Sequence, residues 1–458
     1  MSTNIQKNQI TEGIIWRQLL LFFFPILLGT FFQQLYNTID SVIVGQFVGK
    51  EALAAVGGSS AQIVAFVVGF FTGLSSGASV TIAQFFGAKD SRSANKGLHT
   101  AYVIAAFGGL ILTVSGIILT PFLLEMMNTP ADIVADSAVY LRIYFAGIIF
   151  VLIYNMGSAI LRATGDSKRP LYYLIVCCII NIVLDVLFVI VFHMGVMGVA
   201  VATLIAQAVS AVLVTLKLMR SEGILKLSVK QIRFHGSILK MQLKLGLPTG
   251  FEAILFSITN IAIQSAVNTF GTDTTAAWSA YGKLDAIFWM VSTAFGIAIT
   301  TFVGQNYGAG KMDRVRKSTR VCLLMDFIVS AVLVVFLIAA RFLLFRLFTN
   351  DSHVIEIGCD MLVLITPWYI VYVFIEVIAG ALRGVGNVVV PVAITLLGVC
   401  VLRIAWLAAM LKISPTISAI ILSYPVTWVI TALAFIIYYI YITHKTIAGS
   451  SKKHVPKL

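Results

Sequence analysis

Long apolar segments recur along the whole chain, and each is long enough to cross a lipid bilayer, which takes about 20 predominantly apolar residues in a helix. Only 11% of the residues are charged, whereas soluble domains carry roughly 25%. We therefore predict an all-α integral membrane protein; the unbroken runs exclude a β-barrel, and the polar N-terminus argues against a cleavable signal peptide. Hydropathy predicts twelve transmembrane helices near residues 15–44, 53–82, 98–121, 137–161, 170–192, 195–218, 244–268, 277–303, 318–342, 359–381, 388–411 and 416–442.

Basic residues concentrate in alternate loops of the predicted topology. With the N-terminus inside, roughly 25 of the 32 Lys and Arg residues fall in cytoplasmic segments, as the positive-inside rule requires. We therefore expect a multi-pass protein of the plasma (inner) membrane with both termini in the cytoplasm. The net charge of +13 then indicates contact with the bilayer and not with nucleic acid, because these residues lie in short loops between spans.

Two separate motifs repeat at a single offset of 221 residues. LRATGDSKRP at 161–170 matches LRGVGNVVVP at 382–391, and IAQFFGAKDSRSANK, ending at Lys96, matches VGQNYGAGKMDRVRK, ending at Lys317. The chain is therefore a duplication of six spans. An even number of spans gives both halves the same orientation, which implies two pseudo-symmetric six-helix lobes around a cleft.

The longest predicted loop separates the two lobes. We predict an N-lobe over 1–216, a cytoplasmic linker over 217–243, a C-lobe over 244–442 and a basic cytoplasmic tail over 443–458. The linker mixes Ile, Leu, Val and Phe with basic residues. It is interpreted either as an amphipathic segment on the inner membrane surface or as a solvated basic linker.

Two carboxylates lie at membrane depth in the N-lobe. Asp40 is in the first span, and a charge at the middle of a spanning helix costs about 2.5–3.5 kcal/mol, so such residues face a protein interior or a water-filled cavity. In the fifth span, Asn181 and Asp185 are four residues apart and share one helix face. This oxygen-rich set could bind a sodium ion or share protons. The alternative is a buried polar network that only fixes helix packing.

The combination of repeats and loop motifs resembles the MATE family of multidrug and toxic compound extrusion transporters. The resemblance rests on VGQNYGAGK after span 8, AILRATGDSKRP after span 4 and ALRGVGN after span 10, and it covers nearly the whole chain. It implies a secondary antiporter, and we expect a monomer that is not an enzyme. Such a protein exports amphipathic organic cations in exchange for H⁺ or Na⁺ by alternating access, without another cofactor, and its first span bends at Pro25.

The resemblance also implies a coupling-ion site. Family members with an N-lobe cation site use an Asp in span 1, an Asn and an Asp four apart in span 5, and a Thr in span 6. The matching residues here are Asp40, Asn181, Asp185 and Thr203, with Asp40 and Asp185 as the metal ligands if the ion is Na⁺. For Thr203 the alternative is a hydrogen bond to its own helix backbone.

The C-lobe carries acids of its own. Glu252, Asp285 and Glu376 lie in or near spans, and the repeat places Glu376 opposite Asn155, so the lobes are not equivalent. Some family members bind their cation through a Glu in span 7 and an Asp in span 10, a pattern that this chain matches imperfectly. These acids could instead attract a cationic substrate, and Asp285 could form an ion pair with Lys283.

Further substrate-binding candidates are polar and aromatic residues, because aromatic rings attract organic cations. Several share the first span with Asp40; the candidates are Gln33, Gln34, Tyr36, Asn37, Asn155 and Trp289. The repeated arginines Arg162 and Arg383 are expected at helix ends beside lipid phosphates, in a structural or gating role. A flippase for a lipid-linked precursor is the alternative function, disfavoured by the mostly acidic character of the intramembrane ionisable residues.

Overall fold

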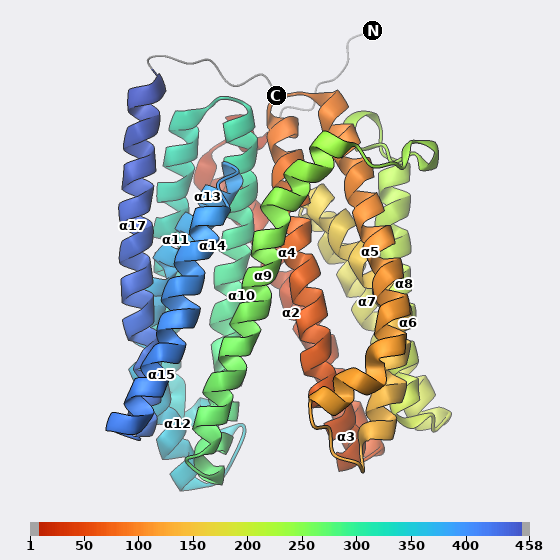
Figure 1. The fold of residues 1–458 in the computed structure, drawn as a ribbon, viewed down its shortest axis with the longest axis vertical. Helices are drawn as coiled ribbons and strands as arrows, with labels where there is room; N and C mark the ends of the chain where they lie inside the picture. Colours follow the sequence, from red (N-terminus) through yellow and green to blue (C-terminus); the bar gives the residue numbers. More distant parts are fainter. Residues whose placement is uncertain (1–8, 451–458) are drawn as a thin grey trace. The chain divides into compact units, whose positions relative to one another are not determined.

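The structure, a computed structural model, describes residues 9–450 and is almost entirely helical (Figure 1). Twelve helical segments are long and apolar enough to cross a membrane, which confirms the predicted all-α membrane fold, and no strand occurs within residues 9–450. A four-residue helix, α1 (Gln9–Glu12), precedes the first span. Residues 451–458 of the predicted basic tail lie outside the described residues.

The first six spans follow one another with short connections. They are α2 (Ile15–Phe47), α3 (Lys50–Gly57) with α4 (Ser59–Gly87), α5 (Ser91–Met126), α6 (Val134–Ala163), α7 (Lys168–Asp185) with the π-helix η1 (Val186–Val191), and α8 (Gly195–Met219). Several helices exceed the predicted spans, because hydropathy loses its signal at polar helix ends. For example, α5 begins at Ser91 and not near residue 98.

The last six spans repeat this order. They are α9 (Gly236–Asn268), α10 (Thr272–Gly308), α11 (Met312–Arg346), α12 (Ser352–Ile365) with α13 (Tyr369–Gly384), α14 (Val389–Thr395) with the π-helix η5 (Leu396–Val401) and α15 (Leu402–Ile413), and α16 (Ile417–Ile421) with α17 (Ser423–Ser450). The fifth span of each half thus contains a π-helix, a feature that is frequent at functional sites.

The chain divides into two compact units. The N-terminal unit is Phe22–Ala253, and the C-terminal unit is Met1–Leu21 together with Ile254–Leu458. The boundaries fall inside α2 and α9, so each of these helices contributes to both units. The division into lobes and a linker by sequence position stays a prediction.

Helix α6 forms the centre of the N-terminal unit. It packs against α4, α5 and α8. Small residues allow the close approach that membrane helices need for association. A Cβ on Gly116 of α5 would lie only 2.3 Å from the Phe145 ring of α6, so this position requires glycine.

Helix α10 has the same central role in the C-terminal unit, where it packs against α11, α12 and α13. The Thr300 hydroxyl on α10 donates a hydrogen bond of 3.0 Å to the Gly380 carbonyl on α13. In the N-terminal unit, Ser79 on α4 donates one of 3.3 Å to the Ala159 carbonyl on α6. Each pair of positions differs by the repeat offset of 221 residues, so the two halves share a side-chain contact as well as a span order.

The repeated loop motifs form turns with matching backbone conformations. Gly165 and Gly386 both have positive φ angles, of 98° and 87°, as expected for glycines that allow a tight turn. The second pair of motifs places Lys89 at φ 59° and Gly310 at φ 71°. A left-handed conformation is therefore required at this turn in both halves, although only one copy has glycine there.

Candidate functional site

The four residues of the predicted coupling site come from three helices of the N-terminal unit. Asp40 lies on α2, Asn181 and Asp185 on α7, and Thr203 on α8, and all four side chains are buried. The Thr203 hydroxyl donates to Asp40 Oδ2 at 3.4 Å, and Asn181 Nδ2 donates to Thr203 Oγ1 at 3.5 Å. Thr203 therefore connects α2 with α7, and its hydroxyl donates to Asp40 and not to the backbone of its own helix.

Asp185 completes the cluster at the junction between α7 and the π-helix η1. Its carboxyl group interacts electrostatically with that of Asp40, although no hydrogen bond of acceptable geometry joins them. Fully buried, it lies where the helical hydrogen-bond pattern changes.

Several oxygen atoms of this cluster have no hydrogen-bond donor among the described residues. They are Asp40 Oδ1, Asn181 Oδ1, and Oδ1 and Oδ2 of Asp185. A buried acceptor without a partner costs about 1–3 kcal/mol, and more when it is charged. Protons or a hard cation satisfy such oxygens, and hard cations select oxygen ligands. The residues present therefore fit a site for H⁺ or for Na⁺.

Sequence reasoning missed two neighbours of this cluster. Gln207 on α8 donates from Nε2 to the Tyr36 hydroxyl at 3.1 Å, which joins α8 to α2 one helical turn from Thr203 and Asp40. Tyr140 on α6 lies within electrostatic reach of Asp40 and Asp185. Gln207 could have been found from its spacing of four residues after Thr203, which places both on one helix face.

The other candidates on the first span do not join the cluster. Gln34 and Asn37 are exposed and Gln33 is half-buried, and none has a side-chain hydrogen bond to the four clustered residues. Asn155 on α6 is also half-buried. Only Tyr36, of the first-span candidates, points toward a neighbour of the site.

In the C-terminal unit, Asp285 on α10 is surrounded by aromatic hydrogen-bond donors. Its Oδ1 accepts from the Tyr369 hydroxyl at 2.5 Å and from the Tyr281 hydroxyl at 3.2 Å, and its Oδ2 accepts from Trp289 Nε1 at 2.7 Å. The suggested ion pair with Lys283 is wrong, because Lys283 is exposed and the described part of the chain shows no such pair.

A buried arginine lies beside this aromatic group and was not anticipated. The guanidinium carbon of Arg403 lies 4.0 Å from the ring centroid of Tyr424 and 5.9 Å from that of Trp428. One guanidinium nitrogen, Nη2, donates to Thr427 Oγ1 at 2.9 Å. The sequence alone could have pointed to Arg403, because an ionisable residue inside a span is a functional candidate by default.

Glu376 on α13 forms an ion pair with Arg383, with 3.1 Å between Oε1 and Nη2. This corrects the expectation for Arg383, whose charge meets a carboxylate two helical turns earlier and not only the helix end and lipid. Asp326 on α11 is fully buried nearby and interacts electrostatically with Glu376; its Oδ1 accepts from Ser330 at 3.1 Å. Glu252 is half-buried on α9 in the N-terminal unit.

Comparison with known proteins identifies the family. The model of the MatE family matches residues 25–187 and 248–407. This chain belongs to the MATE family. The probable multidrug resistance protein YoeA of Bacillus subtilis is 30% identical over 393 residues, which cover 84% of each chain. The probable multidrug resistance protein NorM of Thermotoga maritima is 27% identical over 420 residues, covering 89% of this chain and 88% of its own.

Solved structures share the fold of this MATE protein. A MATE transporter of the MOP superfamily in an outward-facing conformation matches with a TM-score of 0.90 over 97% of this chain and 99% of its own, at 20% identity. A MOP superfamily transporter from Pyrococcus furiosus matches with a TM-score of 0.90 over 99% of this chain and its own full length, also at 20% identity. The protein is thus a multi-pass membrane transporter of a multidrug efflux family, not an enzyme, and these relatives lend no support to the flippase alternative.

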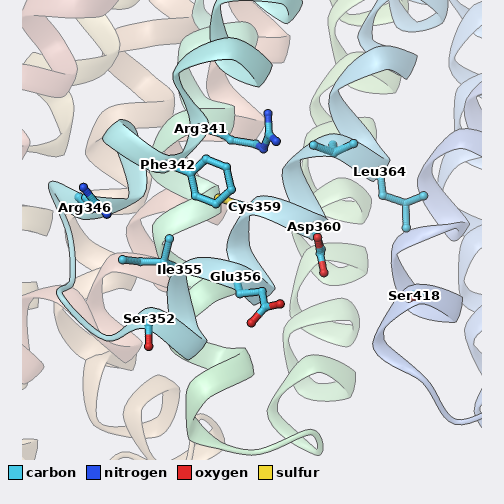
Figure 2. A pocket seen from close by; sticks show the side chains of 11 residues that line it. Arg341, Phe342, Arg346, Ser352, Ile355, Glu356, Cys359, Asp360, Leu364 and Ser418 are labelled. Carbon is cyan, nitrogen blue, oxygen red and sulfur yellow. The ribbon is translucent and has the colours of Figure 1, made fainter.

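The MATE chain also has a cavity of about 850 Å³ that shares no residue with the acidic sites (Figure 2). Figure 2 shows Arg341 and Arg346 projecting from α11, and Glu356 and Asp360 from α12. Because both signs of charge line it, this cavity offers no net attraction for a cation. The case for the cation site therefore rests on the buried oxygens of Asp40, Asn181 and Asp185, and this cavity adds nothing to it.

Proposed function

We propose that this protein is a secondary active antiporter that exports amphipathic organic cations in exchange for H⁺ or Na⁺. The observation that carries the proposal is the pair Asp40 and Asp185, two buried carboxyl groups on separate helices with oxygens that find no hydrogen-bond donor within residues 9–450. Two neighbouring carboxylates at membrane depth repel each other and are poorly solvated. Binding one monovalent cation removes much of both penalties.

The site connects ion binding to movement because its ligands lie on different helices. A bound ion holds α2 against α7 and α8 through Asp40, Asp185 and Thr203. After release, the two carboxylates repel, and α2 is held at this point by the hydrogen bonds from Thr203 to Asp40 and from Gln207 to Tyr36. Pro25 lies inside the same helix as Asp40, where the missing hydrogen bond permits bending. We infer that ion release and rebinding shift α2 and so alternate the access of the substrate.

The C-terminal unit supplies candidates for substrate contact. Asp285 and Trp289 lie in an aromatic group in which Trp289 and Tyr372 pack edge to face at 4.7 Å between centroids. A carboxylate among aromatic rings suits an amphipathic organic cation. Arg403 limits the net negative charge of this group, so cation–π contact would contribute more than charge to recognition.

We also propose how the protein lies in the membrane and that it works as a single chain. The Lys and Arg distribution supports cytoplasmic termini in a plasma (inner) membrane. We propose that the monomer is the working unit, because one chain contains both repeated halves.

The test is transport by purified protein in liposomes. Ethidium movement is followed while a proton gradient or a sodium gradient is imposed separately, which also identifies the ion. Asp40→Asn and Asp185→Asn should each lose most gradient-driven transport, by roughly tenfold or more if each contributes a charge-assisted contact of 1.5–3 kcal/mol. Glu125→Gln, which removes an exposed carboxylate in the same unit, is the matched control. Full gradient-driven transport by either Asn variant would contradict the site.

A further inference from the structure

A second site candidate lies at the start of α5, outside the polar cluster of the N-terminal unit. A cavity of about 340 Å³ opens between the first turns of α5 and the linker that joins α8 to α9. In Figure 1 this linker, drawn in green, runs beside the start of α5. The cavity carries no carboxylate in its lining, which consists of Arg92, Asn95, Lys96, His99, Gln231, Arg233 and His235.

The linker wall of this cavity is fixed by side chains of α5. Asn95 Nδ2 donates to the carbonyl oxygens of Ile224 and Lys226, each at 3.1 Å. His99 is buried, and its Nε2 accepts from the Ser228 amide at 3.0 Å while its Nδ1 donates to the Asn95 carbonyl at 2.8 Å. These contacts hold an irregular segment in place, so the cavity is preorganised.

The cationic side chains of the cavity, Arg92, Lys96 and Arg233, have no ion-pair partner among the described residues. Burial, and then the charges of Arg233 and Lys96, lower the pKa of His235. His235 Nε2 accepts a hydrogen bond from Arg233 Nε at 3.4 Å, which also favours the neutral imidazole.

Asp90 lies near the cavity, and its carboxylate already accepts hydrogen bonds from the start of α5. Asp90 caps the N-terminus of α5, where Oδ1 accepts from the Ser93 amide at 3.0 Å. That hydrogen bond is the main cause of the lowered pKa of Asp90, and Lys96 contributes little to it. Three cationic side chains therefore face the cavity against one capping carboxylate, at a helix N-terminus that itself favours anions.

An apolar surface continues from the cavity along α5. Lys96, Phe107, Ile111, Val114 and Ile118 follow helical spacing along one side of the helix, and the four apolar side chains are each more than half exposed. Phe234 of the linker packs edge to face on Phe107, at 6.3 Å between ring centroids. A basic cavity at the end of a lipid-facing apolar stripe matches the two parts of an anionic lipid.

We propose that this cavity binds the phosphate group of an anionic ligand, with the headgroup of an acidic phospholipid as the source favoured by the apolar stripe. Arg92, Lys96 and Arg233 would contact the phosphate oxygens, and Asn95 and Gln231 offer further polar contacts. The acyl chains would lie along the exposed face of α5 beyond Phe107. A soluble phosphate could use the same cationic contacts but not the stripe. The proposal does not depend on antiport or on its coupling ion.

The test is native mass spectrometry of the full-length protein with added phosphatidylglycerol or phosphatidylcholine. The variant is Arg92→Gln/Lys96→Gln/Arg233→Gln. The control, Lys226→Gln/Lys230→Gln/Lys240→Gln, removes the same charge from exposed lysines in or next to the linker that do not line the cavity. We expect phosphatidylglycerol affinity to fall by on the order of a hundredfold in the variant, at roughly fivefold for each cation, and to change little in the control.

Competition identifies the source of the phosphate. Inorganic phosphate and glycerol 1-phosphate are added to the protein loaded with phosphatidylglycerol. Retention of the lipid at millimolar phosphate supports the lipid headgroup, whereas displacement that the triple variant no longer shows supports a soluble phosphate in the same cavity. Equal retention of phosphatidylglycerol by wild type and variant would overturn the proposal. If the triple variant is unstable, Lys96→Gln alone serves as the variant, and its phosphatidylglycerol affinity should fall about fivefold.

Discussion

Thr203 on α8 donates its hydroxyl proton to Asp40 on α2, with 3.4 Å between Oγ1 and Oδ2, and at the same time accepts from Asn181 on α7. The Thr203 hydroxyl thus lies between the two other helices: it accepts from the Asn181 amide on α7 and orients the Asp40 carboxylate on α2. The remaining carboxyl oxygens of Asp40 and Asp185 have no hydrogen-bond donor in the part of the chain that the structure describes. Thr203 is therefore a positioning residue for the proposed ion site.

Removing this hydroxyl should weaken ion coupling without abolishing the site. Thr203→Val keeps the shape but leaves Asp40 Oδ2 without its donor, which costs about 1–3 kcal/mol. We expect the ion concentration for half-maximal transport to rise by roughly fivefold or more. Ethidium efflux from liposomes, measured over a range of ion gradients, checks this. Thr203→Ser should restore the wild-type value; an unchanged value in Thr203→Val would show that the hydroxyl has no part in coupling.

The Glu376–Arg383 ion pair predicts unequal effects of its two partners. Their side chains are only 19% and 16% exposed, and buried Asp326 lies within electrostatic reach of Glu376. Arg383→Gln would leave the Glu376 carboxylate without its cation and next to buried Asp326, at a cost on the order of 2–3 kcal/mol, slightly below the range for fully buried pairs. Glu376→Gln removes one of the repelling acids and should cost less. Thermal unfolding in detergent, with Arg383→Lys as the conservative control, measures the order.

The turn at Lys89 contains removable backbone strain. Lys89 has a φ of 59°, and the equivalent Gly310 of the second half has 71°. A left-handed conformation costs a non-glycine residue about 1–2 kcal/mol, offset by glycine's greater flexibility when unfolded. Lys89→Gly should therefore stabilise the protein by about 0.5–1 kcal/mol. Gly310→Ala should destabilise it, although a Cβ there meets no atom within 4 Å. Melting temperatures that move in the opposite directions would contradict this account.

Sequence spacing and chemistry predicted a large part of this structure. Hydropathy gave the spans because apolar length is a property of each helix alone, and spacing placed Asn181 and Asp185 on one face. Which helices adjoin depends on packing between distant segments, so the contact of Thr203 with Asp40 rested on the family resemblance. The same limit hid Arg403, whose aromatic partners lie more than twenty residues away. The ion pair of Arg383 could have been predicted from the sequence, because Glu376 lies seven residues earlier on the same helix face.

Acidification should loosen the linker that forms the basic cavity. Burial, together with Arg233, Lys96 and His99, lowers the pKa of His235 while the linker is docked on α5. A linker released from α5 therefore binds more protons than the docked one. Docking is then fully favourable above the ordinary histidine pKa of about 6.5 and weakens as pH falls through that value. Hydrogen exchange of residues 224–235 should therefore accelerate below about pH 6.5 relative to the intrinsic rate. His235→Gln, whose side chain does not titrate, should remove this pH dependence of exchange. If the pH dependence persists in the variant, another group causes it.

The repeated loop motifs each hold a segment that precedes a span. In the N-terminal unit, Asn95 binds the linker before α9. In the C-terminal unit, Arg314 donates to the carbonyl oxygens of Ile10 and Gly13, and Lys311 donates to that of Thr11 at 2.9 Å. The motif is therefore a docking element as well as a turn.

Arg314→Gln should release the segment around α1, since it removes the charged donor that binds two of its carbonyl oxygens. Charge-assisted hydrogen bonds contribute about 1.5–3 kcal/mol each, so amide exchange at residues 10–13 should accelerate by roughly tenfold or more. Arg320→Gln, an exposed arginine two turns further along α11, is the matched control and should leave exchange unchanged. Equal exchange in both variants would mean that packing, and not Arg314, fixes the start of the first span.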